Sequence, residues 1–69
     1  MSEGYAGPLL EALVIKLEGD IAIAKANIGV YKTNAAGIGE HPDVVQAVEL
    51  QIEVIANAEE KIETIRKHF

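Results

Sequence analysis

The chain lacks cysteine and tryptophan, and it has few aromatic and few basic residues. Without cysteine, disulfides and thiolate metal sites are excluded. The aromatic residues are Tyr5, Tyr31 and Phe69, too few for a platform that stacks nucleic-acid bases. With 6 Lys and Arg against 11 Asp and Glu, the net charge is −5, which disfavours phosphate backbones and anionic lipid as direct ligands. We therefore expect neither nucleic acid nor a membrane among the partners.

Long hydrophobic runs are also missing. A bilayer-spanning helix needs roughly 20 apolar residues, and the longest candidate is interrupted by Lys16, Glu18, Asp20 and Lys25. The first residues do not combine a basic region with an apolar stretch, as a signal peptide does. The sequence predicts a soluble, cytoplasmic protein.

The chain is nevertheless rich in apolar residues for its size. Its 69 residues, 49% of them hydrophobic, predict a single domain over residues 1–69. A domain this small buries only about 60% of the surface that its unfolded chain exposes. Since disulfides and thiolate metal sites are excluded, oligomerisation is the remaining common way to stabilise it.

A first helix is expected from about residue 8 to residue 36. Pro8 suits the first helical position, where its missing N–H would have no partner. Apolar residues then recur at alternating spacings of four and three, the heptad pattern of close helix packing. We define these positions as the first seam: Leu10, Val14, Leu17, Ile21, Ala24, Ile28 and Tyr31.

A turn at about 37–41 and a second helix at about 42–68 follow. Gly37 and Gly39 favour the left-handed end of a helix, and Pro42 suits the start of the next. The second helix is amphipathic, with an apolar stripe formed chiefly by Val48, Ile52, Ile55, Ile62 and Ile65, and with Val44 or Val45, Ala58 and Phe69 in addition. The short turn predicts an antiparallel hairpin.

The first helix carries a second stripe, away from the first seam. It consists mainly of small residues: Ile15, Gly19, Ala22, Ala26 and Gly29. Such residues either lie on an exposed face or let another helix approach closely. Each internal glycine costs about 1 kcal/mol of helix propensity, and Ile23 and Val30 add bulk beside the stripe. We therefore expect burial in a homodimeric four-helix bundle, or in a tetramer, with the first helix central.

No group of residues predicts catalysis or metal binding. His41 adjoins Glu40, Pro42 and Asp43, but adjacent positions at a helix start do not match the Glu-x-x-His spacing of helical metal sites. The nucleophile candidates are poor, because Ser2 is the only serine and there is no cysteine. We expect no catalytic residues, no metal and no cofactor.

A metal-binding or enzymatic bundle would need polar residues that point into its interior, and four residues are candidates. These are Asp20, Asn27, Gln51 and Glu59; Asn27 could instead be a single buried polar residue that fixes helix register.

The favoured function is a non-catalytic structural or interaction module that self-associates, and an unidentified protein partner is a further candidate. One alternative is an acidic inhibitor of a basic site, based on Glu49, Glu53 and Glu60. The other is a metal-binding or enzymatic bundle.

Overall fold

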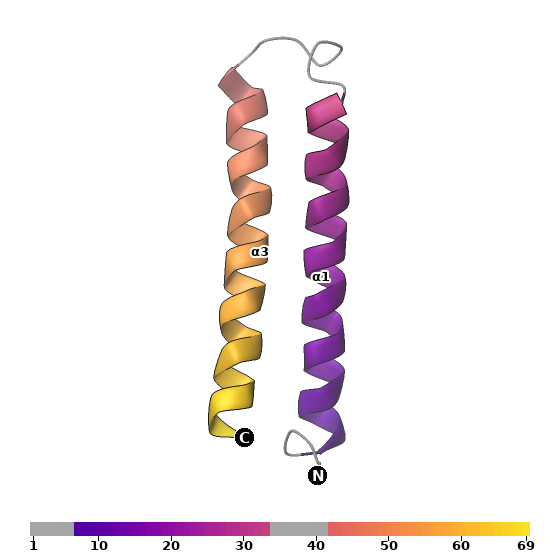
Figure 1. Ribbon diagram of the computed structural model, residues 1–69, viewed down its shortest axis with the longest axis vertical. Coiled ribbons are helices and arrows are strands. Elements are labelled where there is room, and N and C mark those ends of the chain that lie inside the picture. Colours follow the sequence, from indigo (N-terminus) through magenta and orange to yellow (C-terminus); the bar gives the residue numbers. More distant parts are fainter. Residues whose placement is uncertain (1–6, 34–41) are drawn as a thin grey trace.

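The computed structural model describes residues 7–33 and 42–69. They form two helices, α1 (Pro8–Thr33) and α3 (Pro42–His68), which lie side by side and run in opposite directions (Figure 1). The expected all-α hairpin is confirmed. The predicted turn residues Gly37 and Gly39, and the expected helical residues 34–36, lie outside the described residues.

The start of α1 follows from its local sequence. Gly7 has φ +98°, a conformation that glycine adopts without steric cost. Its carbonyl accepts a hydrogen bond from the Glu11 N–H over 3.1 Å. Glu11 in the first turn and Lys32 in the last place charges of the favourable sign at the two ends of the helix dipole. In α3, Asp43 and Arg66 lie at the equivalent ends.

The two helices share one apolar core. Its buried members are 3–7% exposed, and Leu10 and Ile21 pack against them. Because the chain is antiparallel, the first half of α1 packs against the second half of α3 (Figure 1). The core consists of Val14, Leu17, Ala58, Ile62 and Ile65.

The packed side of α3 does not include every residue of the predicted stripe. Ile52 is 52% exposed, whereas Gln51 is half-buried. Apolarity assigns Ile52 to the stripe, but the buried and half-buried positions of α3 other than Ala47 follow the alternating four-three spacing that keeps one face turned toward a neighbouring helix. These positions, the α3 seam, are Val44, Val48, Gln51, Ile55, Ala58, Ile62 and Ile65. Val45 and Phe69, also considered for the stripe, are exposed.

The hairpin is a thin rod with principal extents of 49 × 15 × 13 Å. Over the residues described, neither helix is long and apolar enough to cross a membrane.

Candidate interaction surface

The first seam of α1 lies on the side that faces α3. Val14, Leu17 and Ala24 are buried, and the remaining members are half-buried: Leu10, Ile21, Ile28 and Tyr31. Packing against α3 therefore buries or half-buries all seven positions. The other side of α1 has no contact with the core of the hairpin.

The opposite side of α1 is exposed and nearly free of charge. Ile15 is 64% exposed, Ile23 62% and Val30 52%. The small residues between them are exposed too. Lys16 lies at one edge of this side, and its Nζ contacts Asp20 Oδ2 at 2.8 Å. We define the outer face of α1 as Ala12, Ile15, Gly19, Ala22, Ile23, Ala26, Gly29 and Val30.

Nothing in the described part of the hairpin accounts for the two glycines of this face. A Cβ added at Gly19 or Gly29 would meet no heavy atom within 4 Å, and neither residue has a positive φ. Alanine would thus fit at both positions and improve helix propensity by about 1 kcal/mol each. The packing of α1 against α3 does not require glycine at these positions.

Thr33 Oγ1 lies at the C-terminal end of the outer face. It donates to the carbonyl oxygens of Gly29 at 3.1 Å and Val30 at 3.2 Å. Because the hydroxyl is satisfied within its own helix, it adds little polarity to the face.

A second set of exposed apolar residues lies on the first half of α3. Val45 is 72% exposed, Leu50 56%, Ile52 52% and Val54 40%. The second half of α3 is more polar on its exposed positions, with Glu59, Glu60, Lys61 and Glu63. Much of the exposed apolar surface of the described residues therefore lies on the outer face of α1 and on the N-terminal half of α3.

The polar residues predicted near the interior lie at its edge. Asn27 is exposed in the hairpin, and its Nδ2 donates to Gln51 Oε1 over 3.2 Å. Asp20 is half-buried and Glu59 is exposed. No polar or charged residue is buried in the two described ranges. Their interior is thus entirely apolar.

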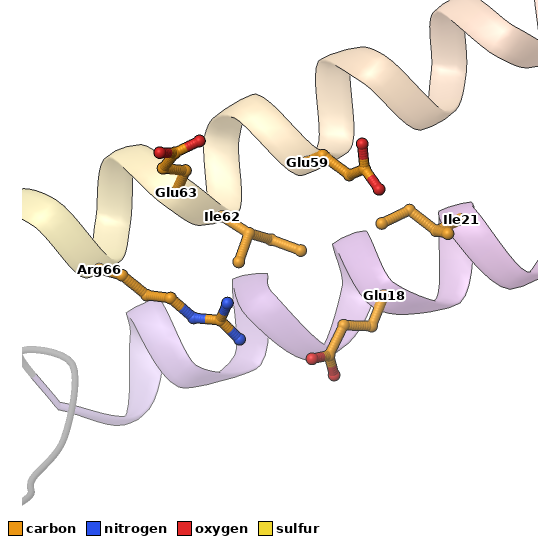
Figure 2. A pocket seen from close by; sticks show the side chains of 6 residues that line it. All are labelled: Glu18, Ile21, Glu59, Ile62, Glu63 and Arg66. Carbon is orange, nitrogen blue, oxygen red and sulfur yellow. The ribbon is translucent and has the colours of Figure 1, made fainter.

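A charged groove runs along one edge of the contact between the helices. It has a volume of about 460 Å³ and is lined by Glu18 and Ile21 of α1 and by residues of α3. Figure 2 shows the Arg66 side chain extending from α3 toward α1, past Ile62. The α3 lining consists of Glu59, Ile62, Glu63 and Arg66. The lining thus combines one guanidinium with three carboxylates.

Metal-ligating residues do not gather in the described ranges: no group of three His, Asp or Glu side chains has a geometry that could hold an ion. His41, the earlier candidate, lies outside those ranges.

Comparison with known proteins finds no similar protein. No family model, no curated protein and no solved structure matches this chain.

Proposed function

We propose that the protein is a small non-catalytic structural module that works as a homo-oligomeric helical bundle, with the outer face of α1 buried between copies. The observation that carries this proposal is the exposure of Ile15, Ile23 and Val30 on a nearly uncharged helix face. A helix that is apolar on both sides is typically buried on both sides.

The size of the chain supports the same proposal. The buried core contains five residues, which is little for an independent domain, and small domains commonly gain stability by associating. Of the residues that the structure describes, ten large apolar ones remain substantially exposed in the single chain. Association through the outer face of α1 removes part of that surface from water at roughly 25 cal/mol per Å².

The experiment compares two matched alanine substitutions. Ala26 is exposed on the outer face of α1, and Ala56 is exposed on α3. Ala26→Glu places a charge in the proposed interface, where burying it without a partner is costly; Ala56→Glu places the same charge outside it. Sedimentation equilibrium should find that Ala26→Glu shifts the protein toward monomer and that Ala56→Glu leaves its mass unchanged. Equal behaviour of the two variants would rule out the outer face of α1 as the interface.

A second candidate function rests on the acidic side of α3. Glu49, Glu53 and Glu60 are exposed, and an oligomer would multiply this charge on its surface. Such a surface suits a basic site on a protein partner. Binding of this kind weakens steeply with added salt because exposed charges are screened, and salt-insensitive binding would count against it.

A further inference from the structure

We propose that the second copy packs antiparallel on the outer face of α1, in the register that places Glu11 and Glu18 of each copy opposite Lys32 and Lys25 of the other. This inference rests on the proposed self-association and adds to it the orientation, the alignment and the residues that meet.

The order of charges along one edge of α1 carries the orientation. Glu11, Glu18, Lys25 and Lys32 recur every seven residues and are all exposed, so they form one line beside the outer face. The first two are acidic and the last two basic. In a parallel pair the two lines lie on opposite sides of the interface and do not meet, so Glu18 and Lys25 face the apolar edge of Ile23 and Val30. An antiparallel copy brings the two lines together and makes every pair opposite in sign.

The same charges fix the alignment. In the proposed register Glu18 lies opposite Lys25 twice, once on each side of the two-fold axis. Sliding one helix by seven residues brings like charges together. In one direction Glu18 lies opposite Glu18 of the second copy, and in the other direction Lys25 lies opposite Lys25. The favourable register is also the one in which the two α1 helices overlap along their full length, from Pro8 to Thr33.

The packing positions agree with this alignment. In an antiparallel pair, the small residues of the outer face form the core, and each layer of this core contains one residue from each copy. No layer contains more than one residue larger than alanine. The helices can therefore approach closely, which gives Gly19 and Gly29 a role that the hairpin alone does not. The layers are Ala12 with Gly29, Ile15 with Ala26, and Gly19 with Ala22.

The other edge of the interface is apolar at its ends. Leu9 is 85% exposed and Val30 52% exposed in the single chain. The proposed register brings Leu9 of one copy beside Val30 of the other. The most exposed large apolar residue of the described chain thereby gains an apolar neighbour.

Disulfide trapping tests the register directly, because the chain contains no cysteine of its own. The Ala12→Cys variant and the Gly29→Cys variant are mixed, unfolded together, refolded and oxidised. The two sites share a layer, so the mixture should give a disulfide-linked dimer containing one chain of each variant. Each variant alone should link poorly, since two copies of residue 12 lie about 25 Å apart along the helix axis and a disulfide requires Cα atoms within about 7 Å.

A matched control uses Ala56→Cys on the exposed side of α3. Mixing it with Ala12→Cys should give only the background level of linkage. Efficient linkage of Ala12→Cys to itself would overturn the proposal in favour of a parallel pair. A protein that sediments as an oligomer but shows no linkage between residues 12 and 29 would overturn the register and leave the proposed function standing. A folded monomer would overturn both.

Discussion

The Nδ2 of Asn27 donates a hydrogen bond to Oε1 of Gln51 over 3.2 Å and thereby joins α1 to α3 across 24 residues of sequence. Gln51 occupies a seam position of α3, with Ile52 beside it pointing outward at 52% exposure. This hydrogen bond lies at the exposed edge of the contact between the helices, so its net contribution to stability is small, because water can replace either amide as a partner.

Replacing Gln51 with leucine should stabilise the hairpin. The side chain is half-buried, so Gln51→Leu adds apolar burial, while the exposed Asn27 amide turns to water. We expect the free energy of unfolding to rise by about 1 kcal/mol, measured by urea denaturation at one fixed protein concentration. Gln46→Leu at an exposed position is the control and should change little. A clear loss of stability in Gln51→Leu would show that the amide contact outweighs the gain in burial.

Truncation in the apolar core should be costly. Leu17 is 4% exposed and belongs to the core cluster, so Leu17→Ala should cost about 2–5 kcal/mol through lost contacts and a cavity. Leu50→Ala removes the same atoms from a side chain that is 56% exposed and should cost under about 1 kcal/mol in the hairpin. Thermal unfolding followed by circular dichroism checks both. Similar effects for the two variants would mean that Leu50 also lies in a packed interior.

The fold could be predicted from the sequence because α1 carries a regular pattern. The seven first-seam residues, from Leu10 to Tyr31, are all buried or half-buried in the structure. In α3 the pattern is ambiguous, because Ile52 is apolar and Gln51 is not, and each fits between Val48 and Ile55. Over the longer run from residue 44 to residue 58, Gln51 keeps spacings of four and three in alternation, whereas Ile52 gives four, four, three and three. Spacing therefore determines which side of α3 faces α1, and the assignment of Ile52 to an interface between copies stays a prediction.

The sequence predicts the apolar residues of the candidate interface but not what covers them. The small-residue stripe from Ile15 to Gly29 lies on the exposed side of α1. A sequence indicates that such a face is apolar, but its periodicity does not report what covers it, since a solvent-exposed stripe and a buried one have the same spacing. The two glycines gave the additional signal, because they reduce helix stability and have no packing role inside the hairpin.

Gly19→Ala separates the stability of the hairpin from that of the assembly. The added methyl group meets nothing within the hairpin, so the isolated helix gains about 1 kcal/mol in propensity. In the proposed dimer the same methyl group lies opposite Ala22 of the second copy, and overpacking costs about 1–3 kcal/mol. We expect more helix at concentrations where the protein is monomeric, and a dissociation constant raised about tenfold. Unchanged or tighter association would place Gly19 outside the interface.

Charge reversal at Lys25 should weaken the assembly, and a second reversal should restore it. Lys25→Glu turns both Glu18–Lys25 pairs of the proposed dimer into repulsive ones. At about 0.2–1 kcal/mol for each exposed pair, the dissociation constant should rise roughly tenfold. The double variant Glu18→Lys, Lys25→Glu exchanges the two charges and should bind nearly as tightly as the original. Glu53→Lys, which reverses a charge on the exposed side of α3, is the control for net charge.

A mixing experiment extends this prediction. Glu18→Lys and Lys25→Glu chains should each self-associate weakly, yet their equimolar mixture should form a heterodimer in which every pair is opposite in sign. Analytical ultracentrifugation at low salt follows both species. No gain on mixing would show that these two residues do not face each other between copies.

The most direct test of the central claim is the mass of the unmodified protein in solution. Sedimentation equilibrium over a wide range of concentration should give a multiple of the 7.4 kDa chain mass down to micromolar protein, because the outer face of α1 is then buried against a second copy. A folded 7.4 kDa monomer throughout that range would contradict the account and leave Ile15, Ile23 and Val30 exposed to water.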